Sequence, residues 1–176
     1  PRNHSSAASD VYKRQVPHLE KSTFKNLKYL IAGAEKVDQS THDKYLEFGT
    51  QILEGYGVTE ASPAVSVNTR ENYKLGSVGK FVTGIDYKIE KIDGYKQGGL
   101  LFIRGKNIIK SYLGQTEEFN WYNTGDVVRV DSEGYLFILG RLKRFAKIAG
   151  EMISLSQIED FPKKLWPENT SIVCSI

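Results

Sequence analysis

The sequence is poor in the residues that form disulfides and zinc sites. Its 176 residues include one cysteine, Cys174, and three histidines, His4, His18 and His42. A single cysteine cannot form an internal disulfide, so a reducing compartment is expected. Because the histidines are scattered along the chain, no zinc cluster is predicted.

Features typical of membrane, secreted and some nucleotide-binding proteins are also missing. No apolar run approaches the roughly 20 residues of a membrane-spanning helix, and no charged-then-apolar signal peptide opens the chain. Neither a GxxxxGK(S/T) phosphate loop nor a GxGxxG motif is present. The net charge of +3 is too small to indicate a nucleic-acid-binding protein.

What is present is the composition of a folded protein. Hydrophobic residues make up 40% and charged residues 26%, and the length suits about one domain. Residues 1–21 show no strand or helix periodicity, and we interpret them as a disordered tail or a cloning or sequence-read artefact. Since the chain begins with Pro1 and its only methionine is Met152, we expect a piece of a longer protein.

The first part of the chain, to about residue 74, has the pattern of an α/β unit. Ser40 or Thr41 is expected to cap a short helix that Gly49 ends. The predicted elements are strands over 27–35, 50–57 and 63–68 and a helix over 42–48. Strand, helix and strand in succession favour an α/β arrangement.

Residues 75–140 are predicted to form an antiparallel β unit, because glycine is frequent and helix periodicity fades. The expected strands cover 85–93, 98–105 and a hairpin over 126–140 with an Asp131-Ser132-Glu133-Gly134 turn. Further on we expect a short strand over 143–148, a helix over 154–161 with Ser154 as N-cap, and a last strand over 170–176.

The run YGVTE, residues 56–60, is the first candidate site. Gly57 would let the backbone approach a ligand, and Tyr56 could stack on a purine ring. Thr59 can donate to a phosphate oxygen, and Glu60 is a hard oxygen ligand for Mg²⁺. The alternative is a plain β-turn with a surface glutamate.

Two further segments could carry chemistry. Asp126 in WYNTGD follows a glycine turn, where a carboxylate can accept both hydrogen bonds of a ribose diol; it could also be an ordinary turn residue. The segment 140–151 has four cations: Arg141, Lys143, Arg144 and Lys147. These form a nucleic-acid patch, a solvated basic strand, or a phosphate-facing Arg141 beside a glycine-flanked joint.

The order and spacing of the motifs along the chain are more specific than any single motif. They are GAEK at 33–36, EGYGVTE at 54–60, GSVGK at 76–80, GGLLFIRG at 98–105, SYLG at 111–114, YNTGD at 122–126 and GRLKRFAKIAGEMISL at 140–155. This series resembles the adenylate-forming enzymes, which include acyl-CoA synthetases and luciferases, over roughly residues 24–176.

The resemblance implies an α/β plus β fold. It assigns 22–140 to the end of the large adenylating domain, with an α/β part to about residue 74 and a β-barrel-like part over 75–140. Residues 141–176 would be the hinge and the beginning of a small α+β domain.

The resemblance also implies that ATP and Mg²⁺ are used to join a carboxylic acid to AMP before acyl transfer to a thiol. For the nucleotide, the resemblance implies that Tyr56 and Gly57 contact adenine, Asp126 binds the ribose and Arg141 reaches the nucleotide. Thr59 would contact the α-phosphate and Glu60 would bind Mg²⁺, while Gly33, Ala34 and Glu35 would lie beside adenine and the acyl group. Lys143 would be the hinge, and Gly150 would lie in the loop that approaches the acceptor. Lys143 departs from the aspartate that many relatives carry at the hinge.

Two phrases, ILEGYGVTEASP and GRLKRFAKIAGEMISL, look most like bacterial acyl-acyl-carrier-protein synthetases. This implies a fatty acid, an acyl carrier protein or CoA, and a lysophospholipid handled by a fused acyltransferase as partners, without nucleic acid. The longer protein would lie at the cytoplasmic face of the bacterial inner membrane, and this piece would be soluble and cytoplasmic.

The family's Ser/Thr/Gly-rich phosphate loop and its late lysine have no match here. We therefore expect little or no ligase activity from this chain alone. A fatty acyl-CoA ligase fragment and a non-catalytic module that binds nucleotide or carrier protein remain the alternatives.

Overall fold

The computed structural model describes residues 26–114, 116, 118–155 and 158–159. Residue contacts divide the chain into two compact units, one up to Glu54 and one from Gly55. Each unit is described by itself. The predicted tail over 1–21, the last strand over 170–176 and Cys174 lie outside the described residues.

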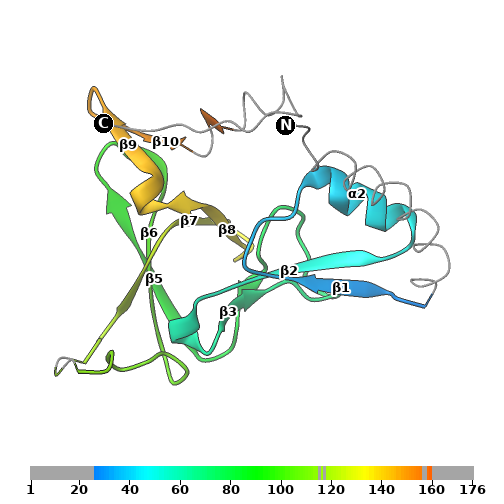
Figure 1. The fold of residues 1–176 in the computed structure, drawn as a ribbon, viewed down its shortest axis with the longest axis horizontal. Coiled ribbons are helices and arrows are strands. Elements are labelled where there is room, and N and C mark those ends of the chain that lie inside the picture. Colours follow the sequence, from blue (N-terminus) through cyan, green and yellow to red (C-terminus); the bar gives the residue numbers. More distant parts are fainter. Residues whose placement is uncertain (1–25, 115, 117, 156–157, 160–176) are drawn as a thin grey trace, which may run out of the picture. The chain divides into compact units, whose positions relative to one another are not determined.

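The first unit contains β1 (Tyr29–Ala32), α2 (Gln39–Glu47) and the beginning of β2 (Gln51–Gly57). The two strands run parallel, with Tyr29 opposite Gln51 (Figure 1). Parallel neighbours need a crossover connection, and α2 is that connection. The predicted strand–helix–strand order is therefore confirmed.

The start of α2 differs from the prediction. The N-cap residue is Asp38, and its side chain makes no capping hydrogen bond. Ser40 and Thr41 lie inside the first helical turn and cannot cap the helix, because it already begins at Gln39. Its end is as predicted, since Gly49 follows in the left-handed region with φ 74°.

The second unit is mostly β-structure (Figure 1). The end of β2 pairs antiparallel with β3 (Ala64–Val67), and β3 pairs with β4 (Lys80–Phe81). A four-stranded antiparallel sheet follows in chain order: β5 (Ile85–Ile92), β6 (Tyr95–Gly105), β7 (Tyr122–Val130) and β8 (Leu136–Arg141). Buried residues of both segments share one core, formed by Val58, Ala61, Val65, Leu101, Ile103, Val128 and Leu136.

After β8 the chain forms short elements. The predicted strand over 143–148 is shorter, because a 3₁₀ turn, η2 (Leu142–Arg144), precedes β9 (Phe145–Ile148). β10 (Glu151–Ser154) pairs antiparallel with β9 and was not predicted. Ser154 ends β10 and directly precedes helical residues at Leu155, Ile158 and Glu159, where a helix was predicted. Its hydroxyl would cap the amides of residues 156–157, which lie outside the described residues, so the capping role stays a prediction.

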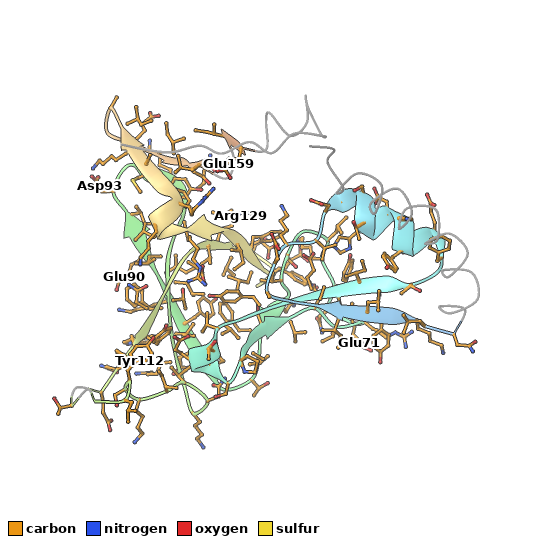
Figure 2. All side chains as sticks on the ribbon, in the orientation of Figure 1. Glu71, Glu90, Asp93, Tyr112, Arg129 and Glu159 are labelled. Atoms are coloured by element: carbon orange, nitrogen blue, oxygen red, sulfur yellow. The ribbon has the colours of Figure 1, made fainter. Side chains whose placement is uncertain are left out.

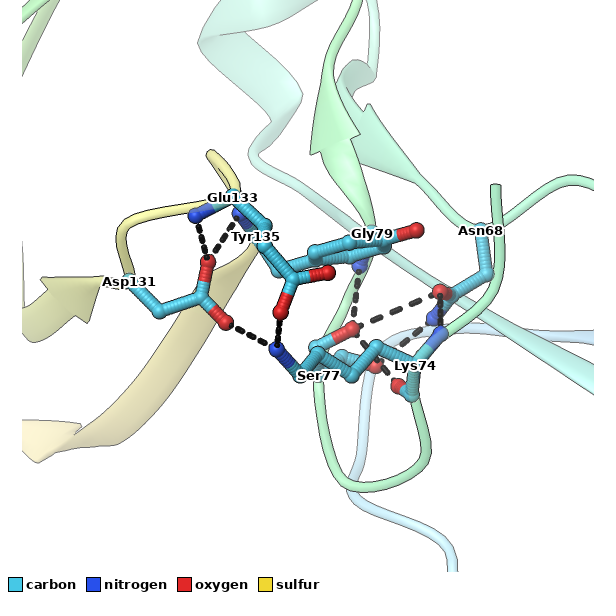
Figure 3. A network of polar contacts seen from close by, with 7 residues as sticks. All are labelled: Asn68, Lys74, Ser77, Gly79, Asp131, Glu133 and Tyr135. Carbon is cyan, nitrogen blue, oxygen red and sulfur yellow. Dashed lines mark hydrogen bonds and ion pairs between the residues drawn. The ribbon is translucent and has the colours of Figure 1, made fainter.

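A polar network ties the segment after β3 to the β7–β8 turn (Figure 3). Lys74 Nζ lies 2.7 Å from Asp131 Oδ2 and 2.5 Å from Glu133 Oε1. The backbone around Lys74 is held in turn, since its amide donates to Asn68 Oδ1 and its carbonyl accepts from Ser77 Oγ. Asn68 and Ser77 are both buried, so these polar contacts fix the loop together with the packing of Val78 on the core.

The β9–β10 hairpin docks on the β5–β6 turn, where Figure 2 labels Asp93. The Met152 amide donates to the Gly94 carbonyl over 3.0 Å. Lys147 Nζ lies 2.7 Å from Asp93 Oδ2. At Gly94 the two backbones come so close that a Cβ atom would lie 2.3 Å from the Gly150 carbonyl oxygen.

This approach predicts that Gly94→Ala loosens the hairpin. Gly84→Ala is the matched control, because both glycines have positive φ (79° and 91°) but a Cβ at Gly84 would meet nothing within 4 Å. Both variants carry left-handed strain of about 1 kcal/mol. We expect Gly94→Ala to speed amide hydrogen exchange at Met152 and to be the less stable in urea. Equal exchange in the two variants would show that the hairpin does not rest on Gly94.

The Lys74 network predicts a contribution to acid stability. The hydrogen bond from Lys74 is the main cause that holds the pKa of Asp131 below its ordinary value. A lowered carboxyl pKa stabilises the fold above the unfolded value of about 4, and this stabilisation disappears as pH falls through the folded value. Asp131→Asn should therefore be less stable near pH 7 but lose less stability on acidification, measured by urea unfolding at about pH 7 and pH 3. Asp86→Asn, which alters an exposed pair with Arg104, is the control and should follow the wild type.

Candidate nucleotide site

Asp126 is the centre of the polar cluster in the second unit. Its side chain is 4% exposed, and it lies opposite Arg141 in the β7–β8 register. Arg141 Nε is 2.8 Å from Asp126 Oδ1, and the Tyr56 hydroxyl donates to Asp126 Oδ2 over 2.5 Å. The carboxylate therefore joins residues of β2, β7 and β8.

The YNTGD run shapes the strand around this carboxylate. Thr124 Oγ1 donates to the Leu101 carbonyl and accepts from the Asp126 amide. Gly125 takes the left-handed φ of 73°, which a side chain would disfavour. Arg141 Nη1 also donates to the Thr124 carbonyl, so the guanidinium is held at two points while 62% of the side chain stays exposed.

Burial is the main electrostatic influence on this cluster. It raises the pKa of Asp126, while the hydrogen bond from Tyr56 and the charge of Arg141 oppose that rise. Burial, followed by the neighbouring Asp126 carboxylate, raises the pKa of Tyr56 far above its ordinary value. The proton therefore stays on Tyr56, which donates to the carboxylate.

Gly57 lies at a close approach of the chain to itself. A Cβ atom there would lie 1.9 Å from the Pro63 carbonyl oxygen. The register of β2 and β3 shifts between Tyr56 and Gly57, which brings the two strands together at this point. Glycine is thus required by the close approach of the chain to itself.

Thr59 and Glu60 lie in a 3₁₀ turn, η1 (Thr59–Ala61), directly after β2. Thr59 is exposed and Glu60 is half-buried. Glu60 Oε1 accepts from the Tyr112 hydroxyl over 2.7 Å, and the Tyr112 and Tyr122 hydroxyls are 3.2 Å apart. The bond from Tyr112 is the main cause of a lowered pKa at Glu60, which keeps this carboxylate ionised near neutral pH.

The Glu60 carboxylate suits a magnesium ion that is also bound by phosphate oxygens. Among the described residues no group of three or more His, Cys, Asp or Glu could hold a metal ion by itself. Mg²⁺ in nucleotide sites is commonly bound by one or two carboxylates together with phosphate oxygens and water. An ionised, accessible Glu60 is such a carboxylate.

The loop 33–35 belongs to the first unit and is described with that unit alone. It follows β1, and Ala34 has the left-handed φ of 74°. The Val37 amide donates to Glu54 Oε1, and His42 Nε2 lies 3.0 Å from Glu54 Oε2. A buried carboxylate at the end of the parallel strand therefore anchors the chain just after this loop.

The basic segment 140–151 is largely neutralised by carboxylates. The pairs are Arg141 with Asp126, Arg144 with Glu159 and Lys147 with Asp93. Within the described residues Lys143, which lies exposed in η2, has no ion pair. These pairs offset much of the segment's positive charge, which weakens the charge argument for a nucleic-acid patch. Gly150 lies exposed in the β9–β10 turn with φ 90°.

Two contributors were missed from the sequence. Tyr112 lies in SYLG and Tyr122 in YNTGD, both noted as motifs, but neither received a role. Their hydroxyl contacts connect residues up to 52 positions apart. No local pattern predicts such a pair.

The fold and the site together define an adenylate-forming enzyme fold with a polar edge suited to a nucleotide. This chain belongs to the AMP-binding enzyme family, whose pattern it matches over residues 4–113.

Curated relatives are identical to this chain at about a third of the aligned positions. Feruloyl-CoA synthase from an Amycolatopsis species is 30% identical over 156 residues, which cover 82% of this chain and 32% of the relative. Long-chain-fatty-acid–CoA ligase from Escherichia coli O157:H7 is 32% identical over 149 residues, covering 78% and 27%. The chain thus spans about a third of the length of these relatives.

A solved structure agrees. O-succinylbenzoate coenzyme A synthetase from Bacillus subtilis, in complex with ATP and magnesium ion, superposes with a TM-score of 0.67 at 25% identity. The match covers 82% of this chain and 34% of that one. The predicted α/β plus β fold of an adenylate-forming fragment is confirmed.

The Tyr56–Asp126 bond predicts a stability effect. Tyr56→Phe removes a donor from a buried carboxylate, which should cost about 1–3 kcal/mol of unfolding free energy in urea. Tyr87→Phe is the control, because no hydrogen bond of its hydroxyl is found within the described residues, and it should change stability by less than about 0.5 kcal/mol. Equal stabilities of the two variants would contradict the prediction.

Proposed function

We propose that this chain supplies part of the nucleotide site of an ATP-dependent acid–thiol ligase. In that reaction a carboxylate attacks the α-phosphate of ATP, pyrophosphate leaves, and the acyl group then passes from AMP to a thiol. The observation that carries the proposal is the Asp126 carboxylate held between Tyr56 and Arg141 in a chain of the AMP-binding enzyme family.

Each residue of the cluster has a proposed task. The Asp126 carboxylate accepts from the ribose hydroxyls through lone pairs that Tyr56 and Arg141 leave available. The exposed guanidinium of Arg141 donates to the nucleotide. The Tyr56 ring flanks adenine next to Gly57, although its hydroxyl is held by Asp126.

At the phosphates, Thr59 donates to an α-phosphate oxygen and Glu60 holds Mg²⁺. The bound ion would offset the repulsion between the two anionic reactants. We further propose that Gly33, Ala34 and Glu35 border the adenine and acyl positions.

The acceptor thiol is proposed to be coenzyme A. The relatives and the solved structure named above all carry CoA in their names, with aryl or fatty acids as the other substrate. An acyl carrier protein, a fused acyltransferase and its lysophospholipid rest only on the resemblance of residues 52–63 and 140–155.

The C-terminal segment has a proposed conformational role. Lys143 in the η2 turn would be the hinge between the large domain, ending at about Gly140, and a small domain. Gly150 would approach the acceptor thiol after the small domain rotates about this hinge.

In the described residues there is no helix with the length and apolar character to cross a membrane.

Binding of ATP and of 2′,3′-dideoxy-ATP to the 176-residue chain, both with Mg²⁺, tests the proposal by calorimetry. If Asp126 grips the ribose diol, the wild type should prefer ATP by about 10-fold or more. Asp126→Asn should lower ATP affinity and shrink this preference. Asp131→Asn, a carboxylate change outside the cluster, should keep it. A wild type that binds both nucleotides equally, or neither, contradicts the proposed function.

A further inference from the structure

The segment after β6 returns to the turn that carries Thr59 and Glu60. The Ile109 amide donates to the Glu60 carbonyl over 2.8 Å. Asn107 Nδ2 donates to the Ala61 carbonyl over 2.6 Å. Two separate donors therefore hold the backbone of η1, although they lie more than forty residues further along the chain.

The same segment also reaches the Glu60 side chain. Tyr112, labelled in Figure 2, donates its hydroxyl to Glu60 Oε1 over 2.7 Å. The Phe119 ring packs edge to face against both Tyr112 and Tyr122, at centroid distances of 5.6 and 5.7 Å. The shared aromatic neighbour limits the positions that the two hydroxyls can take.

Chemistry sets the direction of these hydrogen bonds. An ionised carboxylate only accepts, so Tyr112 must donate to Glu60. The Tyr112 oxygen is then the acceptor for Tyr122, whose hydroxyl lies 3.2 Å away. A carboxylate has about four lone-pair sites, so Glu60 keeps acceptor capacity for a cation beside its contacts with the two tyrosines.

The geometry points to Tyr112, supported by Tyr122, as a positioning residue that orients the Glu60 carboxylate toward a metal–nucleotide ligand. This inference rests on the proposed function, which makes Glu60 the Mg²⁺ ligand. Carboxylates that bind metals are themselves held by hydrogen bonds, and loss of such a partner commonly costs about 10–100-fold in metal affinity.

The test is the gain in ATP affinity that Mg²⁺ produces in the 176-residue chain. ATP binding is measured with Mg²⁺ and with EDTA for the wild type, Tyr112→Phe and the control Tyr87→Phe. We expect Tyr112→Phe to reduce the Mg²⁺-dependent gain about 10-fold and to leave metal-free ATP binding unchanged. Tyr87→Phe should behave like the wild type, since its hydroxyl makes no hydrogen bond within the described residues.

A double-mutant cycle separates positioning from a general structural effect. In a Glu60→Gln background, adding Tyr112→Phe should cause no further loss of the Mg²⁺-dependent gain. An unchanged gain in Tyr112→Phe, or an equal loss with and without Mg²⁺, overturns the inference and leaves the proposed function standing. A wild type that binds no ATP, or gains nothing from Mg²⁺, overturns the Glu60 role itself and the inference with it.

Discussion

The second unit depends on the burial of one carboxylate, that of Asp126. A buried charge is costly unless it is paired and hydrogen-bonded. Here one oxygen faces the Arg141 guanidinium and the other the Tyr56 hydroxyl, so the pairing joins β2 to the β7–β8 hairpin, 70 positions further along the chain. The same contacts place a carboxylate, an aromatic ring and an exposed guanidinium at one edge, which is what a nucleotide site requires.

The first unit also contains a buried carboxylate with hydrogen-bonding partners, that of Glu54. Glu54 is 5% exposed, and its two oxygens contact the Val37 amide and the His42 ring. The loop 33–35 is therefore followed by an anchored segment. In each unit a buried acid helps to hold a segment with a proposed ligand role.

The elements that the sequence predicts well are those in which local pattern and packing agree. The strand–helix–strand unit and the hairpin over 126–140 depend on apolar alternation and on turn residues such as Gly134. The wrong assignment concerns capping at Ser40 and Thr41, because the N-cap of α2 is Asp38. A cap depends on where the first helical turn begins, and the local sequence does not fix that position to within one or two residues.

The amino-acid sequence by itself determined the fold class and the candidate residues. Strand and helix periodicity indicated the α/β and β parts, and the ordered motifs that resemble the adenylate-forming enzymes pointed to the site residues. It also placed Asp126 and Arg141 among the candidates. Only the tertiary structure decided that they pair, that Gly57 accommodates Pro63, that the basic segment is neutralised and that Tyr112 contacts Glu60. These are contacts between distant residues, whose partners are chosen by strand register and burial, and no local pattern encodes them.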